Sequence, residues 1–528
     1  MPSPQRSGRI GRAKSKTGCD TCKIRRIRCG EEKPSCVKCT STGRQCAYSV
    51  LQPQRALASP FPQWHSGQRE RRAFEFYFHQ AGPALAGIID LTFWNGAVLQ
   101  MCRLEPAVWD AVISLSALYE RPPINDSSPF SLIHSPADVR YDYHHEALVW
   151  YSRSLAALQQ RIHRGVADVT ISTIACILFI AIELIQGHRS AAVALYTKGT
   201  QLLTDVTTSP ASGAELEFLT ATTSSIFHRL RAQFLISTDG TLCESRATDC
   251  TEMRKQFGSI TEARNALADL VGEWKILNRR VKDSLEQLDG RSCETSSAIQ
   301  QRRDNLERRL MAWHTSFVPM VSAQDLYPSP QQSDGPTSLL LMTYISILIE
   351  TQTSLAFNEM VYDKYDAEFT HILEYAPKAL GATRTLDGRQ PGFMFEMGVF
   401  LPLFITALKC RNPKLRRQAL NFLLDAPPVQ GLCMCSPVVD LIAMIILVEE
   451  DLVALDRAES LIGVLAGPGR YPTADKRIAT FNVSSYLNND GRRENRLHLA
   501  AYVANAEGRC VLSGRSVLLP SPGSETSA

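Results

Sequence analysis

The stretch CDTCKIRRIRCGEEKPSCVKCTSTGRQC, residues 19–46, decides the fold of the N-terminal part of this chain. Its cysteines follow the spacing C-x2-C-x6-C-x6-C-x2-C-x6-C, which is one C-x2-C-x6-C unit written twice. Pairs of the form C-x2-C are typical of structural zinc, which takes thiolates in closed tetrahedral sites. The pattern predicts a metal-binding module whose ligands are Cys19, Cys22, Cys29, Cys36, Cys39 and Cys46.

The number of thiolates limits how the metal is held. One tetrahedral zinc ion uses four thiolates and two independent ions use eight, whereas two ions that share two bridging thiolates use six. A disulfide framework needs an oxidising compartment, and we expect none because no secretory signal is found. Iron–sulfur ligation is possible in principle, but the usual cluster spacing is lacking. We therefore expect two Zn²⁺ ions, whose binding supplies the folding free energy of so small a segment.

Charge is distributed unevenly along the 528 residues. Residues 1–50 hold 12 Lys and Arg against 3 Asp and Glu, whereas the other 478 residues hold 45 basic and 50 acidic ones. The N-terminal region alone therefore implies a polyanionic partner. Four of its cations lie between Cys22 and Cys29. A basic helix end of this kind fits the major groove of double-stranded DNA, where Arg bonds guanine bidentately.

The residues between the cysteines suggest a division of labour. If residues 20–26 form a short helix, Arg25 and Arg26 leave on its outer side, while Ile24 and Ile27 face the cluster. The second unit carries fewer cations and looks like a scaffold, with Lys38 available to phosphate.

These motifs, CDTCKIRRIRC and KPSCVKCTSTGRQC, resemble the fungal Zn2Cys6 binuclear cluster transcription factors. The resemblance implies that Cys19 and Cys36 are the bridging thiolates. It also implies that Cys22 and Cys29 complete the shell of one zinc ion, and that the last two cysteines complete that of the other. In the family the module places a helix in the major groove of DNA.

The same resemblance implies roles for the cations of the first unit. Arg25 and Arg26 match the positions that contact bases, and Lys23 and Arg28 match phosphate contacts. Family members usually have Arg where Lys23 stands and Lys where Arg26 stands. The exchange keeps the charge but alters the base preference, because Arg and Lys read bases differently.

We expect a small Zn2Cys6 binuclear cluster module followed by a large all-α helical regulatory domain. The expected regions are a disordered basic arm (1–18), the DNA-binding domain (19–46), a proline-broken linker without heptads (47–68), the helical domain (69–510) and a disordered tail (511–528). No sustained strand alternation is found. Apolar residues at helical spacing predict helices over 69–81, 105–119, 261–288, 298–313, 338–355, 395–409, 413–424 and 438–455.

Three segments of the body, ERRAFEFYFHQAGPAL, EPAVWDAVISLSALYE and LPLFITALKCRNPKLRRQALNFL, resemble the fungus-specific helical regulatory domain that follows such clusters. The most apolar segment, residues 169–185, has only nine uninterrupted apolar residues and predicts a buried helix rather than a membrane span. Nucleophile, phosphate-loop and H-E-x-x-H motifs are not found in the body, so we expect no enzyme.

The sequence therefore predicts a nuclear transcription factor that reads CGG-type triplets through the helix after Cys22 and regulates transcription by RNA polymerase II. Control of metabolic or secondary-metabolite genes follows from the resemblance alone. Transcription machinery or a small-molecule effector is a further expected partner of the helical domain, and a membrane is not. Monomer and homodimer both remain open. Zinc buffering is an alternative that leaves the basic residues unexplained.

Overall fold

The computed structural model of the chain divides into two compact units, residues 1–62 and 63–528. The predicted basic arm and linker lie outside the described residues, apart from Gly18 and residues 67 and 68. The described residues are 18–46 without Arg26 and Pro34, 67–122, 138–164, 168–207, 214–237, 256–286, 296–325, 335–451 without Leu386, 468–487, 493–504 and 510–518.

The described part of the first unit contains two short helices. Helix α1 (Asp20–Ile24) and helix α2 (Val37–Thr40) each begin one residue after the first cysteine of a C-x2-C-x6-C unit. The predicted helix at residues 20–26 is therefore confirmed, although it ends earlier. A positive φ of 63° at Gly43 reverses the chain after α2, which a glycine allows without steric cost.

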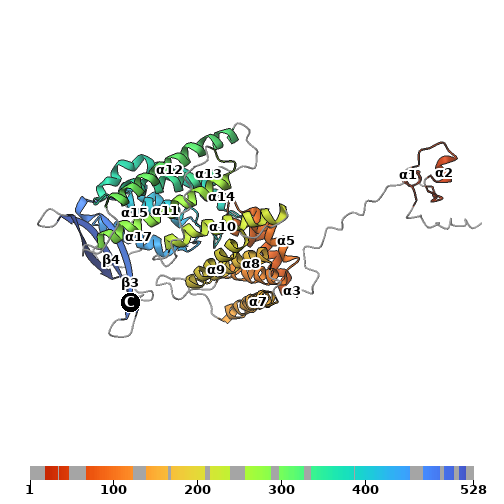
Figure 1. Ribbon diagram of the computed structural model, residues 1–528, viewed down its shortest axis with the longest axis horizontal. Coiled ribbons are helices and arrows are strands. Elements are labelled where there is room, and N and C mark those ends of the chain that lie inside the picture. Colours follow the sequence, from red (N-terminus) through yellow and green to blue (C-terminus); the bar gives the residue numbers. More distant parts are fainter. Residues whose placement is uncertain are drawn as a thin grey trace, which may run out of the picture. The chain divides into compact units, whose positions relative to one another are not determined.

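The second unit begins with helices that pack mainly against their neighbours in sequence (Figure 1). Helix α6 starts at Pro106, where a missing N–H costs nothing. Helix α8 is buried along nearly its whole length, as predicted for residues 169–185. The elements of this half are α3 (Gln68–Phe76), η1 (Tyr77–Ala81), α4 (Gly82–Ala86), η2 (Thr92–Ala97), α5 (Val98–Cys102), α6 (Pro106–Glu120), α7 (Asp138–His163), α8 (Val169–Ile185), α9 (Arg189–Thr207) and α10 (Ala214–Ser237).

A large apolar core joins the helices of the second half. Trp313 lies at its centre, fully buried, and its indole N–H donates to the carbonyl of Ala263. The predicted helix at 413–424 is confirmed to the residue, whereas the one predicted at 298–313 continues to Asp325. The elements are α11 (Ile260–Glu286), α12 (Ser296–Asp325), α13 (Gly335–Thr353), η3 (Glu359–Tyr365), α14 (Asp366–Thr383), α15 (Phe400–Lys409), α16 (Pro413–Leu424), β1 (Val429–Gln430), β2 (Cys433–Met434), α17 (Cys435–Glu449) and η4 (Ala474–Lys476).

The expectation of a body without strands is wrong at the C-terminal end. Strands β3 (Ile478–Leu487), β4 (Arg493–Ala504) and β5 (Cys510–Leu518) form an antiparallel sheet in that order (Figure 1). Residues 511–518 of the predicted disordered tail belong to β5. One face of the sheet buries Ile478, Leu497 and Leu499 against α15 and α17, which is the usual way for an antiparallel sheet to be half buried. The body is thus mostly, but not wholly, helical.

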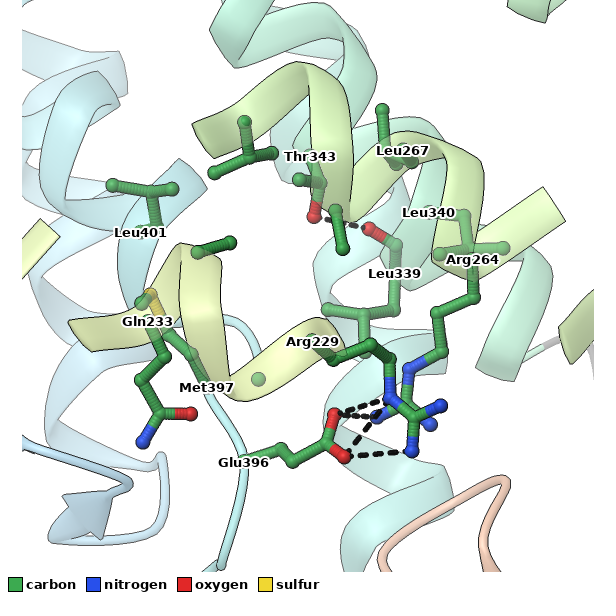
Figure 2. Close-up of a pocket in the computed structure, with 14 residues that line it drawn as sticks. Arg229, Gln233, Arg264, Leu267, Leu339, Leu340, Thr343, Glu396, Met397 and Leu401 are labelled. Carbon is green, nitrogen blue, oxygen red and sulfur yellow. Dashed lines mark hydrogen bonds and ion pairs between the residues drawn. The ribbon is translucent and has the colours of Figure 1, made fainter. Parts of the chain in front are cut away.

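A buried ion network connects the two halves of this unit. Arg229 on α10 and Arg264 on α11 each bridge the carboxylates of Asp90 and Glu396, with nitrogen–oxygen distances of 2.5–2.8 Å. Figure 2 shows Arg229, Arg264 and Glu396 of this network among the residues that line a small cavity of about 90 Å³. Burial would raise the pKa of Asp90, but the two guanidinium groups hold it below its ordinary value.

Candidate metal centre and nucleic-acid interface

Four thiol groups of the first unit meet at distances that suit zinc. The sulfur atoms of Cys19, Cys22, Cys36 and Cys39 lie 3.6–3.8 Å from one another in four pairs. A tetrahedral ion with Zn–S bonds of about 2.3 Å separates its sulfur ligands by about 3.8 Å. All four side chains are buried, and their sulfur atoms all lie within 4.8 Å of one another.

The remaining two cysteines flank this group in a symmetric manner. The backbone N–H of Cys19 donates to the sulfur of Cys29, and that of Cys36 donates to the sulfur of Cys46, each at 3.3 Å. Cys46 is partly buried and packs against the cluster formed by the other five cysteines. The structure therefore gathers all six predicted ligands in one cluster, and four of them, Cys19, Cys22, Cys36 and Cys39, lie within 4.8 Å of one another.

Cysteine side chains form the interior of the described part of this unit. Among the described residues, its apolar cluster contains the six cysteines and no aliphatic or aromatic side chain. Ile24 is 82% exposed and Ile27 is 39% exposed. The prediction that these two isoleucines face the cluster is therefore wrong. The six thiol groups already fill the small interior, so larger side chains stay outside.

Hydrogen bonds hold the two halves of the unit against each other. Thr21 donates through its hydroxyl to the carbonyl of Gln45 at 2.9 Å. The Nη1 of Arg25 donates to the carbonyl of Lys38 and to the hydroxyl of Thr42, each at 3.3 Å. Sequence analysis did not anticipate this second role for Arg25, because only the folded unit places α2 beside it.

The predicted DNA contacts differ in exposure. Lys23, Arg28 and Lys38 are exposed, Arg25 is half-buried, and Arg26 lies outside the described residues. The exposed cations belong to both units of the module. Their charge is therefore presented on its surface, and the thiols on the inside, which suits a metal-stabilised polyanion-binding module.

The described cysteines of the helical unit have ordinary surroundings. Cys102, Cys176, Cys410 and Cys435 are buried in the helical unit. Burial raises the pKa of Cys176 to about 12, so it stays a neutral thiol. Within the described ranges, only the N-terminal cysteines form a group that suits a metal ion. Among these same residues, no helix is long and apolar enough for a bilayer.

Comparison with known proteins places these features in a family. The profile of the fungal specific transcription factor domain matches residues 72–427. The chain belongs to this family. A second profile, the fungal Zn(2)-Cys(6) binuclear cluster domain, matches residues 17–55, and such a domain binds two zinc ions. Both domains belong to transcription regulators rather than to enzymes.

Curated family members share shorter stretches with the chain. The aspercryptin biosynthesis cluster-specific transcription regulator atnN of Emericella nidulans is 48% identical over 48 residues, which cover 9% of this chain and 8% of atnN. Sterol uptake control protein 2 of Saccharomyces cerevisiae is 56% identical over 38 residues, or 7% of this chain and 4% of that protein. Transcriptional regulatory protein moc3 of Schizosaccharomyces pombe is 37% identical over 73 residues, covering 13% and 14%.

These matches span only a small share of each relative. No solved structure matches the chain. The sequence comparisons thus identify the family and the zinc cluster domain. Roles of single residues are argued from the local geometry.

Proposed function

We propose that the protein is a nuclear, sequence-specific DNA-binding transcription factor that regulates genes transcribed by RNA polymerase II. The observation that carries the proposal is a six-thiol centre whose outer surface presents Lys23, Arg28 and Lys38. The names of relatives, such as the aspercryptin cluster regulator and the lysine biosynthesis regulatory protein, favour metabolic or secondary-metabolite genes as targets. The helical domain is then the part that meets the transcription machinery or an effector.

In this proposal Cys19 and Cys36 bridge the two zinc ions. Both lie beside Cys22 on one side and Cys46 on the other. The sulfur atom of Cys22 also lies 3.8 Å from that of Cys39. The assignment of Cys22 and Cys29 to one zinc shell, and of Cys39 and Cys46 to the other, therefore rests on the family resemblance and on the repeated cysteine spacing. The zinc ions neutralise the thiolates and fix the helices, and the chain supplies the DNA contacts.

Base reading is assigned to Arg25 and Arg26, because these positions match the base-contact positions of the family, and the expected target is a CGG-type triplet. Lys23, Arg28 and Lys38 are assigned to phosphates, which position the module without reading sequence. If Arg25 contacts a base, it gives up its hydrogen bonds to Lys38 and Thr42 when DNA binds. If it keeps these hydrogen bonds, it stabilises the fold of the module instead. Arg26 is therefore the cleaner test of base reading.

The test is a titration of the full chain on a CGG-containing duplex and on a scrambled duplex at several salt concentrations. Arg26→Ala should cost about 1–3 kcal/mol on the CGG duplex and much less on the scrambled one. Lys23→Ala should weaken both equally and reduce the slope of log affinity against log salt by about 0.9. Arg389→Ala is the control, because that 87% exposed cation lies in the other unit. Equal losses on both duplexes for Arg26→Ala would remove it as a base reader.

A further inference from the structure

Arg25 and Thr42 occupy equivalent positions in the two halves of the zinc module. Each is the third residue after the second cysteine of its C-x2-C-x6-C unit, which is Cys22 in the first unit and Cys39 in the second. The structure brings these two side chains together, because the Nη1 of Arg25 donates to the Oγ1 of Thr42 at 3.3 Å. The contact therefore joins the two units, and the proposed function gives Thr42 no role.

The hydroxyl of Thr42 is also bound to helix α2. Its Oγ1 lies 3.0 Å from the carbonyl oxygen of Lys38 and 3.2 Å from that of Cys39. Carbonyl groups in the last turn of a helix lack partners within the helix, so the hydroxyl proton of Thr42 satisfies one of them. A hydroxyl group donates one hydrogen bond and still accepts others. Thr42 thus accepts from Arg25 while it donates to α2.

The guanidinium group of Arg25 has a second acceptor in the same helix. Its Nη1 donates to the carbonyl of Lys38 at 3.3 Å. Because Arg25 is the residue that caps the C-terminal end of α1, its side chain runs from the end of α1 to α2. Arg25 is half-buried, whereas Lys23 and Arg28 are exposed. The guanidinium group of Arg25 is therefore directed toward the second unit rather than into solvent.

These contacts join the two parts of the module to which the proposed function assigns different tasks. Arg26, which is assigned to a base, follows Arg25 in the chain, and Lys38, which is assigned to a phosphate, belongs to α2. Phosphate contacts fix the register of a protein on the duplex, and base contacts read the sequence. Both kinds of contact form together only if α1 and α2 keep a fixed relative position. The hydrogen bond between Arg25 and the backbone of Lys38 supplies such a constraint.

We propose that Arg25 keeps these hydrogen bonds in the DNA complex and that Thr42 is a positioning residue, which acts through Arg25. Together they hold the end of α1, and with it Arg26, in register with Lys38 on α2. Keeping the hydrogen bonds is favourable, because bonds from a charged donor cost more to break than neutral ones. The inference rests on the proposed function and narrows its base-reading pair to Arg26.

The experiment is a titration of the full-length zinc-loaded protein on a CGG-containing duplex and on a scrambled duplex at several salt concentrations. Thr42→Val removes the hydroxyl and keeps the shape of the side chain, whereas Thr42→Ser keeps the hydroxyl. Thr40→Val is the matched control, because the hydroxyl of Thr40 contacts the carbonyl groups of Cys36 and Val37 at the start of the same helix. Native mass spectrometry counts the zinc ions in every protein.

Thr42→Val should reduce the ratio of the two affinities about fivefold, which corresponds to one lost hydrogen bond of about 1 kcal/mol. The slope of log affinity against log salt should not change, because no phosphate contact is removed. Thr42→Ser and Thr40→Val should keep the ratio of the unchanged protein. Both zinc ions should remain bound in all these proteins, so that the loss reflects positioning and not unfolding of the module.

The sign of the effect distinguishes the two possible roles of Arg25. If Arg25 had to leave Thr42 to reach a base, Thr42→Val would remove a competing partner and tighten binding to the CGG duplex. Tighter binding or an unchanged ratio in Thr42→Val would overturn the proposal. An equal loss in Thr42→Ser or in Thr40→Val would do the same.

A measurement without DNA separates this inference from the proposed function, which fails if the unchanged protein binds both duplexes equally. The contact between Arg25 and Thr42 joins the two units in the free protein. Thr42→Val should therefore release zinc to EDTA faster than Thr42→Ser does. Equal rates of release would overturn the role of Thr42 in holding the two units together.

Discussion

The side chain of Glu449, at the end of α17, stabilises the helical unit through several buried polar contacts. Its carboxylate is fully buried and accepts from the Nη2 of Arg411 at 3.0 Å and from the backbone N–H of Ile478 at 2.7 Å. Its other oxygen pairs with the Nη2 of Arg416 at 2.7 Å. Glu449 thus connects two buried arginines to the first residue of β3.

Glu449→Ala would leave unsatisfied charge in the interior. Arg411 retains Glu359 at 3.0 Å, but among the described residues the only charged partner left to Arg416 is Glu450 at 3.9 Å, beside the carbonyl of Ala407 at 3.4 Å. Loss of one partner of a buried ion pair costs about 3–5 kcal/mol, and an unsatisfied buried N–H at Ile478 adds about 1–3 kcal/mol. The sum approaches the whole stability of a typical domain, which is about 5–15 kcal/mol.

The assay is urea unfolding of the full chain, followed by the fluorescence of its buried tryptophans. We expect Glu449→Ala to unfold at a much lower urea concentration, with the sheet released first. Glu449→Gln should fall between it and the unchanged protein, because the amide still accepts from Ile478 but has no charge. Asp387→Asn, at an exposed ion pair, should leave the midpoint unchanged. A loss below about 1.5 kcal/mol for Glu449→Ala would refute the reasoning, since burial and pairing would then be worth no more than a surface contact.

Three further outcomes are expected. Native mass spectrometry should find two zinc ions per chain and lose both in Cys19→Ala or Cys36→Ala; a single zinc in the unchanged protein would contradict the shared-ligand arrangement. Burial would raise the pKa of Glu449, but Arg411 and Arg416 hold it below its ordinary value of 4.5. Its contribution to stability is therefore present above about pH 4.5 and lost as the pH falls through the lower folded-state pKa, so the urea midpoint should fall at acid pH and should not change between pH 6 and 8 through this group. Sedimentation of residues 1–62 should show a monomer, because no heptads follow Cys46; a tight dimer would disprove this.

The helices were predicted well where an apolar stripe and an end signal coincide. At residues 413–424, Asn412 accepts from the N–H of Lys414 and Pro413 begins the helix, so both the start and the pattern are local. The strands were missed, although Phe481 and Val483 alternate with polar residues in β3, as do Leu497 and Leu499 in β4. Such short alternations are weak signals of a strand. The sheet is also stabilised by packing on α15 and α17, and the sequence does not show that these helices lie next to it.

The sequence by itself determined the metal centre, because a zinc ion selects ligands by type and spacing and all six lie within 28 residues. It also determined the charge of the module. Most helices followed from the sequence as well, because a helix depends on residues that are close together in the chain. Only the tertiary structure decided where the isoleucines of the module point and which charges meet. Asp90 and Arg264 are 174 residues apart, and a charged residue in a sequence does not specify its partner.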